Sequence, residues 1–482
     1  MAEQSWGEGY VVDLDYTHGY YRELAPAHLA FVTLLAGLRP AESEPGFTYY
    51  ELGCGHGHST ALHACTNPTG QFIGIDFNPS HVQSAQRLAR EAGIGNVRFL
   101  EKSFAEALEM DLPDAEVIAL HGVWTWIGDE HRRQIVEFIR RRLKPGGIAY
   151  LSYNTLPGLA QVAPLQRLLA EHAAQLPGDR MEQVGRALDF AERLEKTGAL
   201  YFAASPVARA RLGGARRLDQ HYVAHEYFNA NWSLQYHLDV ARALAPAKLG
   251  YAASAALVDN FEQFALKPEA AKLVAEIRDR SLAETVKDFV RNQVFRKDVF
   301  TRGAPAAAAG ELEAMLGRTR FALARPLARC ALTGATPAGE VTLKEEAHRP
   351  VLRALARSPM TFDELAAAPE AQGLGRVRLR QALFGMAALG NVLPALPRAG
   401  EEARRAAAGR FNLAALSRPM PGPADTLLAS PVLGAGVPVH FIDRIFLGSP
   451  RNEQAAADNA WATMKSRGLR VRRGDQVVDD EN

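Results

Sequence analysis

Three glycines at alternate positions, followed nineteen residues later by an aspartate, constrain the fold of this chain more than any other feature. Gly53, Gly55 and Gly57 follow a short apolar run that includes Glu51, and a second apolar run ends in Asp76. Glycine is required where the backbone takes a positive φ or comes close to a ligand. An aspartate at the carboxyl end of the next strand can accept hydrogen bonds from both hydroxyls of a ribose. The pattern therefore predicts a strand, a glycine turn, a helix and a second strand that together bind a nucleotide.

The spacing of these glycines indicates which nucleotide is bound. A dinucleotide-binding turn, G-x-G-x-x-G, would place its third glycine at position 58, where this chain has His58. The order found here, E-x-G-x-G-x-G from Glu51 to Gly57, resembles motif I of the class I S-adenosylmethionine (SAM) methyltransferases. In that family the turn passes under the methionine part of SAM, and the acidic residue helps to position its amino group. A glycine-rich loop of another α/β fold is the alternative.

Apolar runs and amphipathic stretches alternate along the first third of the chain. Strands are predicted over 47–52, 72–76, 96–100, 117–120 and 148–153. Helices are predicted from about 59, over 79–91 and over 129–143. This alternation predicts an α/β fold with a doubly wound, mostly parallel, Rossmann-like sheet. The turn at 144–147, Lys-Pro-Gly-Gly, also resembles the methyltransferase family.

Composition limits where such a protein works and what it binds. A chain of 482 residues is long enough for about three domains. Its formal net charge of +1 is too small to produce a general electrostatic attraction to nucleic acid or to an anionic membrane. Three scattered cysteines are too few for a disulfide framework or a zinc site, and no apolar stretch reaches the length of a transmembrane helix. Because the start of the chain also lacks the features of a signal peptide, we expect a cytoplasmic protein.

The rest of the chain is predicted to add three regions to the SAM-binding domain at 1–157. Residues 158–218 have the mixed charged and apolar pattern of a helical insertion. Within 219–302 we expect strands over 221–229 and 251–257, and helical structure over 270–300. A C-terminal domain at 311–482 contains the order helix, helix, helix, strand at 347–397, which predicts a winged-helix-like region. A linker is predicted at 418–423.

Three arginines in the winged-helix-like region raise the question of DNA binding. Arg376, Arg378 and Arg380 are spaced by two, so on a helix they spread over more than one face. Because the chain as a whole is close to neutral, we favour contacts with protein, including a homo-oligomer, over nucleic-acid binding.

Several segments resemble bacterial methyltransferases that carry a methyltransferase regulatory domain, which would be residues 219–302 here. The segments are 20–24, 74–79, 120–126, 224–229 and 295–300. Rickettsial protein-lysine methyltransferases are similar in this arrangement. The resemblance implies SAM as the cofactor and transfer of its methyl group to lysine side chains of a protein substrate. A SAM-dependent methyltransferase of a small molecule and a SAM-binding regulator without catalysis are the alternatives.

The resemblance and the ends of the strands together define candidate site residues, since ligands of such sheets bind at the carboxyl ends of the strands. The residues expected to bind SAM are Glu51, Gly53, Gly55, Gly57, Asp76, Phe77, Ser103, Phe104, His121 and Gly122. The residues expected beside the reacting methyl group are His121, Trp124 and Tyr153. Aromatic faces at that place would attract a methylated ammonium. Trp126 is the weaker candidate of the two tryptophans, and core packing of both is the alternative.

Three histidines cluster around the glycine turn. His56 and His58 flank Gly57, and His63 follows on the predicted helix. No acidic residue stands at a ligand spacing from them, so we expect no metal site.

Overall fold

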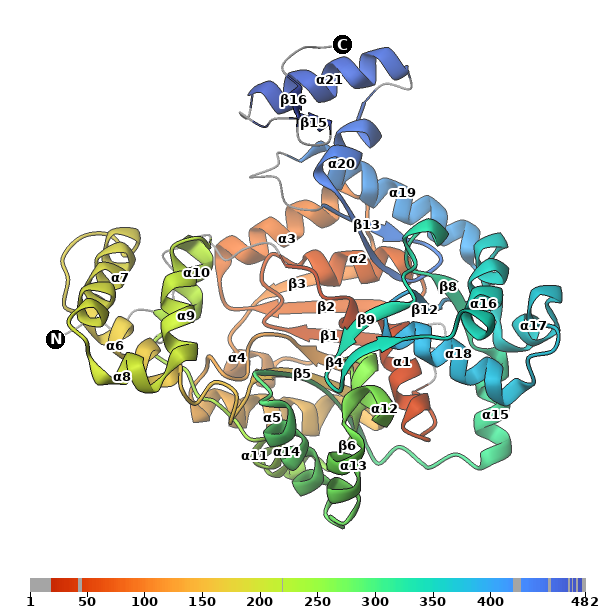
Figure 1. Cartoon of the computed structure of the whole chain (residues 1–482), viewed down its shortest axis with the longest axis horizontal. Coiled ribbons are helices and arrows are strands. Elements are labelled where there is room, and N and C mark those ends of the chain that lie inside the picture. Colours follow the sequence, from red (N-terminus) through yellow and green to blue (C-terminus); the bar gives the residue numbers. More distant parts are fainter. Residues whose placement is uncertain are drawn as a thin grey trace.

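A seven-stranded sheet forms the centre of the molecule (Figure 1). The computed structural model of the protein describes residues 19–41, 46–218, 220–418, 426–449, 452–466, 469, 471–473 and 476–478. The linker predicted at 418–423 lies outside these residues except for its first position.

The strands of this sheet follow the order β3-β2-β1-β4-β5-β7-β6. Their bounds are β1 (Thr48–Leu52), β2 (Gln71–Asp76), β3 (Val97–Glu101), β4 (Ala115–Leu120), β5 (Leu143–Asn154), β6 (Leu249–Ser254) and β7 (Phe295–Arg302). The first five strands are parallel, and β7 runs antiparallel between β5 and β6. The predicted doubly wound, mostly parallel sheet is confirmed.

Helices cover both faces of the sheet, because successive side chains of a strand point to opposite faces. Tyr49 packs into the core that contains α1 (Pro26–Leu35), whereas its neighbour Tyr50 packs into the opposite core. The helices of that opposite face are α4 (Phe104–Glu109), α5 (Asp129–Arg142) and α11 (His237–Leu244). Beside α1 lie α2 (His58–Thr66) and α3 (Pro79–Glu91), which share a further core with β3.

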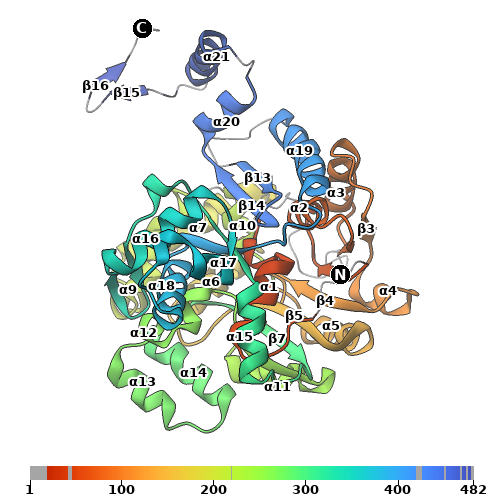
Figure 2. The same cartoon turned by 90° about the vertical axis from the view of Figure 1, so that its right-hand side faces the viewer.

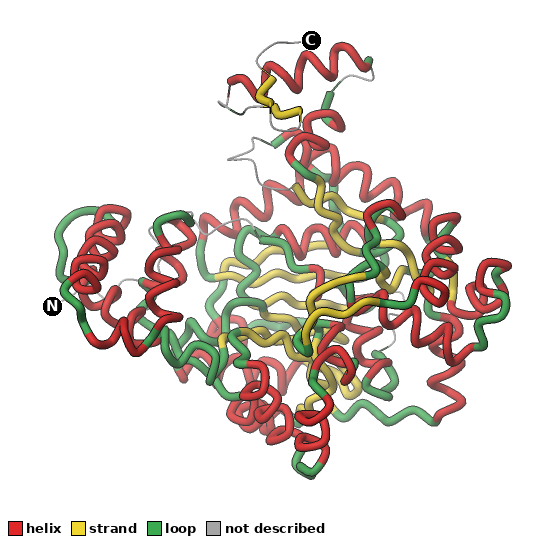
Figure 3. The backbone as a smooth tube through the Cα atoms, viewed as in Figure 1, coloured by secondary structure: helices red, strands yellow, loops and turns green. Residues whose placement is uncertain are grey.

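An entirely helical arm projects from the end of β5, at the left of Figure 1 and red in Figure 3. Its helices are α6 (Ala163–Ala173), α7 (Arg180–Lys196), α8 (Leu200–Ala204), α9 (Pro206–Ala215) and α10 (Gln220–Tyr227). The strand predicted over 221–229 is wrong, since α10 occupies most of this range. Val223, Ala224, Tyr227 and Phe228 are all buried in the core of the arm. This is a helical period, although the aromatic side chains favour a strand locally.

The helical structure predicted over 270–300 is wrong at its end. Two helices, α13 (Pro268–Ala275) and α14 (Arg280–Arg291), follow the short α12 (Glu262–Ala265). Asn292 then adopts a left-handed conformation with φ of 47° and ends α14, so that the chain enters β7. Arg296 and Asp298 on β7 are both buried, and the guanidinium lies 2.9 Å from the Asp298 carboxylate. Arg296 also pairs with Glu284 and Asp288 of α14, at 2.9 and 2.7 Å. Mutual neutralisation lets this charged strand occupy the interior.

The C-terminal third contains the predicted winged-helix-like arrangement. Its helices α16 (Glu345–Arg357), α17 (Phe362–Ala367) and α18 (Arg376–Ala388) pack beside a three-stranded antiparallel sheet. That sheet consists of β8 (Arg320–Leu323), β11 (Met360–Thr361) and β12 (Val392–Ala395). Arg376 and Arg380 pair with Glu313 of α15 (Ala309–Arg318), at 2.9 and 3.2 Å. The remaining elements of this third are β9 (Thr333–Thr336), β10 (Gly339–Thr342), α19 (Glu401–Ser417), β13 (Thr426–Ser430), β14 (Ala435–Val439), α20 (Phe441–Leu447), α21 (Glu453–Ser466), β15 (Val471–Arg473) and β16 (Gln476–Val478).

The C-terminal third also packs against the nucleotide-binding half. Figure 2 shows α19 beside α2 and α3. Phe411 of α19 is fully buried and its ring lies edge-on to His58, with centroids 5.5 Å apart. On the neighbouring hairpin, the backbone N–H of Gly436 donates to the hydroxyl of Tyr20. Helix α2 is therefore enclosed on its outer side by residues more than three hundred positions away in the sequence.

Candidate active site

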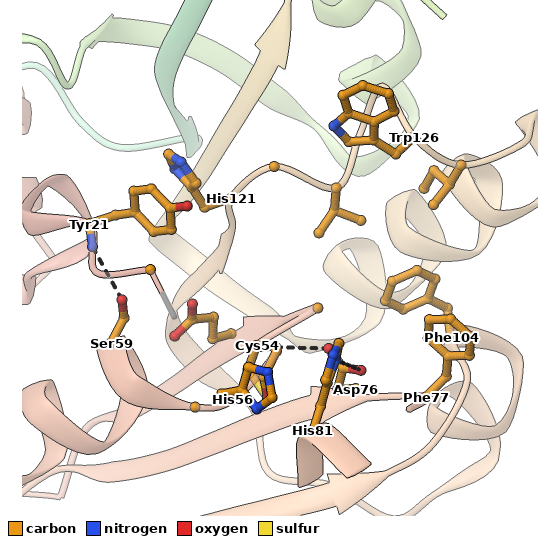
Figure 4. Close-up of a pocket in the computed structure, with 18 of the residues that line it drawn as sticks. Tyr21, Cys54, His56, Ser59, Asp76, Phe77, His81, Phe104, His121 and Trp126 are labelled. Atoms are coloured by element: carbon orange, nitrogen blue, oxygen red, sulfur yellow. Dashed lines mark hydrogen bonds and ion pairs between the residues drawn. The ribbon is translucent and has the colours of Figure 1, made fainter. Parts of the chain in front are cut away.

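A cavity opens at the carboxyl ends of β1, β2 and β4 (Figure 4). All ten residues predicted to bind SAM line its wall. Trp126, the weaker of the two tryptophan candidates, also lines it. So do residues that were not predicted as part of the site: Gly19, Tyr21, Cys54, His56, His58, Ser59, His81, Lys102, Val123, Ile127, His131 and Asn231. The structure thus gathers the predicted set in one place, and the contacts of each residue with SAM stay predictions.

The three glycines form the turn between β1 and α2, and all have positive φ, at 70°, 52° and 67°. They are required for different reasons. A Cβ atom on Gly57 would lie 2.5 Å from the Cβ of Ala85 and from the ring of Phe99, so this glycine permits close packing of α2 on the sheet. A Cβ atom on Gly55 would meet nothing within 4 Å, and this residue lines the cavity. The missing side chain of Gly55 therefore leaves space in the cavity for a ligand, whereas that of Gly57 leaves space for neighbouring side chains of the protein.

Asp76, at the end of β2, is held by three hydrogen bonds. One carboxylate oxygen accepts from the backbone N–H of Gly55 at 2.8 Å, and the other accepts from that of Asn78 at 3.0 Å. Nδ1 of the buried His81 lies 3.3 Å from the second oxygen. Three of the four lone-pair positions of the carboxylate are then in use, and the oxygen bonded to Gly55 keeps one with which it can accept from a ribose hydroxyl.

Glu51 occupies the floor of the cavity and is almost completely buried. The hydroxyl of Thr60 on α2 donates a hydrogen bond to its carboxylate. Burial nevertheless raises the pKa of Glu51 to about 7, because loss of water disfavours the charged form more than the hydrogen bond favours it. A cationic group bound beside Glu51 would restore the ionised state.

Two aromatic side chains, Phe77 and Phe104, lie together on one side of the cavity (Figure 4). Ser103 is the N-cap residue of α4, and its hydroxyl and backbone take part in a capping box with Glu106. The serine hydroxyl is engaged by Glu106, so the flat apolar surface on this side of the cavity comes from the two phenylalanines.

The opposite side of the cavity contains a stacked pair of rings. Tyr21 lies on His121 with ring centroids 3.5 Å apart and an angle of 24° between the planes. Nδ1 of His121 is 2.8 Å from the hydroxyl of the buried Tyr150. Burial, reinforced by the charge of Lys297, lowers the pKa of His121 to about 3, so the imidazole is neutral at ordinary pH.

The structure does not bring Trp124 and Tyr153 to the cavity, so their predicted place beside the methyl group is wrong. Both are fully buried and belong to the core on the α5 and α11 face of the sheet. The pleat of β5 explains the position of Tyr153. The hydroxyl of Ser152 accepts from the N–H of Gly122, a cavity residue, at 2.8 Å. Tyr153 points to the opposite face of the sheet and donates to Asp298 at 2.5 Å. Trp126 lines the cavity instead of Trp124.

Neither a metal site nor a membrane helix is found in the described part of the chain. No group of three histidine, cysteine, aspartate or glutamate side chains there is arranged to hold a metal ion. No helix of the described residues has the length and apolarity needed to cross a bilayer.

Comparison with known protein families matches two parts of the chain. Residues 43–211 match a family described as "Methyltransferase domain". Residues 219–302 match a family described as "Predicted methyltransferase regulatory domain". Together with the cavity described above, these matches define a SAM-dependent methyltransferase, and SAM is its cofactor. The residues present fit SAM: Gly55 leaves space beside the turn, Asp76 is anchored and keeps one lone pair for a hydroxyl, and Glu51 offers a buried partner for an amino group.

Individual relatives extend the similarity along the whole chain. The uncharacterized protein sll1526 of Synechocystis sp. is 36% identical over 477 residues, covering 99% of this chain and 94% of that protein. The uncharacterized protein RP789 of Rickettsia prowazekii is 26% identical over 274 residues, covering 56% of this chain and 48% of that protein. PKMT2 from Rickettsia typhi, solved in complex with AdoHcy, shares the fold with a TM-score of 0.71 at 19% identity, covering 96% of this chain and 95% of that one. The chain therefore belongs to the SAM-dependent methyltransferases that carry a methyltransferase regulatory domain.

Proposed function

We propose that this protein transfers the methyl group of SAM to lysine side chains of a protein substrate. The observation that carries the proposal is the neutral, largely aromatic wall formed by Tyr21, His121 and Trp126 across the cavity from Asp76 (Figure 4). The sequence resemblance to rickettsial protein-lysine methyltransferases and the fold shared with PKMT2 support the same reading.

Lysine chemistry explains why such a wall is suitable. Only an uncharged amine can attack a methyl group, and an apolar environment disfavours the ammonium form of lysine. SAM supplies the activated methyl group when it is bound, so the task of the chain is to align the acceptor and exclude water. Because burial keeps His121 neutral, it adds no positive charge beside the incoming amine. The ring faces of Tyr21 and Trp126 attract the methylated product through cation–π interactions.

This proposal transfers the role first given to Trp124 and Tyr153 to side chains that line the cavity. Trp126 replaces Trp124, and Tyr21, which lies far away in the sequence, replaces Tyr153. His121 also lines the cavity, and in this proposal it keeps the role that the sequence analysis gave it.

The test is incubation of the protein with methyl-labelled SAM and a bacterial lysate, followed by separation of protein from small molecules and mass spectrometry of the labelled fraction. We expect label on lysine residues. We also expect Trp126→Ala to reduce transfer at least about tenfold while SAM affinity stays within a few-fold, because the ring acts on the acceptor side. Trp461→Ala, a tryptophan of the remote α21, serves as the matched control. Label confined to small metabolites would support small-molecule methylation, and SAM binding without any transfer would support a regulator.

A further inference from the structure

The wall of the cavity includes one residue from outside the methyltransferase half. Asn231 lines the cavity, although it follows the helical arm and lies within the residues that match the regulatory domain. The next residue, Trp232, packs against the core of the arm. The part of the chain described as regulatory therefore reaches the site where methyl transfer takes place.

Backbone hydrogen bonds fix this segment to two strand ends. The N–H of Ser233 donates to the carbonyl of Thr125 at 2.8 Å, in the loop after β4. The N–H of Gln235 donates to the carbonyl of Asn154 at 3.1 Å, at the end of β5. The carbonyl of Gln235 accepts from the N–H of Leu156 at 3.0 Å. Residues 231–235 thus run along the carboxyl ends of β4 and β5, the edge at which ligands of such sheets are bound.

The side chains of two tryptophans also join residues 231–235 to the loop after β4. The rings of Trp126 and Trp232 are stacked, with centroids 5.9 Å apart and an angle of 16° between their planes. Trp126 is 8% exposed and lines the cavity, so Trp232 supports it from behind. A change at Trp232 would move the surface that Trp126 presents to the cavity, without touching the glycine turn or Asp76.

We infer that Asn231, together with Trp126 supported by Trp232, forms the acceptor-side wall of the active site, so that the regulatory domain selects the methyl acceptor directly. Asn231 provides an amide carbonyl that can accept a hydrogen bond from a primary amine. Trp232 holds the ring of Trp126, which forms the flat apolar part of the cavity wall. This inference rests on the proposed transfer to lysine for the nature of the acceptor, but not for the location of the wall.

The first measurement is steady-state methylation of poly-L-lysine. Asn231→Ala and Trp232→Ala should each raise the KM for the polymer at least about fivefold, with SAM affinity within twofold of the wild type. Trp232→Phe retains a stacked ring and should recover most of the loss. Phe190→Ala removes an aromatic ring that stacks on His172 elsewhere in the arm, and should leave KM unchanged. A KM that is equally raised by Phe190→Ala, or that is unchanged in both site variants, overturns the inference.

The second measurement needs no acceptor. Sinefungin carries a primary amine where SAM carries its methyl group, whereas AdoHcy has neither. In calorimetric titration, Asn231→Ala and Trp232→Ala should each lower the affinity for sinefungin at least about threefold more than the affinity for AdoHcy. An unchanged ratio of the two affinities in both variants would overturn the inference. If the wild type fails to methylate poly-L-lysine but the ratio changes, the lysine proposal fails and the acceptor wall stands.

Discussion

Replacing Glu51 by glutamine should make the protein more stable and, at the same time, a poorer binder of SAM. Glu51 is almost fully buried on β1, and burial raises its pKa from 4.5 to about 7. This shift corresponds to about 3 kcal/mol of unfavourable free energy when the carboxylate is ionised in the folded protein. Glutamine has the same shape, carries no charge and can still accept the hydrogen bond from Thr60.

The sign of the effect depends on pH. Between pH 4.5 and about 7 the folded protein holds a proton on Glu51 that the unfolded chain has already released. The wild type therefore loses stability as the pH rises through this window, whereas Glu51→Gln does not. The two proteins should be equally stable below pH 4.5, and the variant should be more stable by up to about 3 kcal/mol above pH 7.

Two assays examine this prediction. Denaturation of both proteins over a series of pH values gives the difference in the free energy of unfolding of the domain that contains β1. Calorimetric titration with SAM near pH 6.5, in buffers of different ionisation enthalpy, counts the protons released on binding. We expect the amino group of SAM to favour the ionised form of Glu51, so the wild type should release more protons than the variant. SAM affinity of the variant should fall at least about tenfold, since a charge-assisted hydrogen bond is worth about 1.5–3 kcal/mol.

Two results would refute this reasoning. A stability difference that is the same at pH 4 and pH 8 would mean that Glu51 has an ordinary pKa. Equal proton release by the wild type and the variant would mean that the carboxylate does not face the amino group of SAM.

Further substitutions test other parts of the fold and the site. Asp76→Ala should lower SAM affinity at least about tenfold in calorimetry, because a charge-assisted hydrogen bond to the ribose and the anchor of the Gly55 N–H are lost; unchanged affinity with an intact fold would reject that role. Gly55→Ala and Gly57→Ala carry a similar backbone strain, because both positions have positive φ, but only a Cβ atom at position 57 meets Ala85 and Phe99. Gly57→Ala should therefore lower the melting temperature more, and Gly55→Ala should lower SAM affinity more; the reverse order would contradict the assigned roles. Arg296→Met should destabilise the fold by about 3–5 kcal/mol in denaturant titration, since buried carboxylates lose their partner. Arg133→Met, which breaks an exposed ion pair with Glu130, should leave the denaturation midpoint close to that of the wild type.

Local patterns in the sequence were sufficient to predict the nucleotide-binding half. The glycine turn and Asp76 are separated by one helix, so their meeting at one sheet edge follows from the βαβ unit alone. The alternating order of strands and helices similarly predicts a parallel sheet. Each of these inferences relies on contacts between neighbouring elements of the chain.

The errors arose where distant residues determine the structure. Phe295–Arg302 became a strand because β5 and β6 flank it, and its buried charges are compensated by α14. The cavity combines Tyr21, Trp126 and Asn231 from three widely separated segments. Trp124 and Trp126 are both aromatic and only two positions apart, so only the course of the loop after β4 decides which one faces the cavity. No local spacing contains that information.

Helix α2 joins the nucleotide-binding half to the C-terminal third through packing. Every residue of this helix from Ser59 to Thr66 is buried, with the sheet on one side and α19 on the other. The same helix begins at the glycine turn, and Ser59 accepts a hydrogen bond from the N–H of Tyr21 at 3.3 Å. Through Tyr20 and Gly436, the C-terminal hairpin is joined to this corner of the cavity. The C-terminal third is thus part of the packing that holds the cofactor turn and Tyr21 in place. That coupling agrees with a similarity to the Synechocystis protein that extends over 99% of the chain rather than over the methyltransferase half alone.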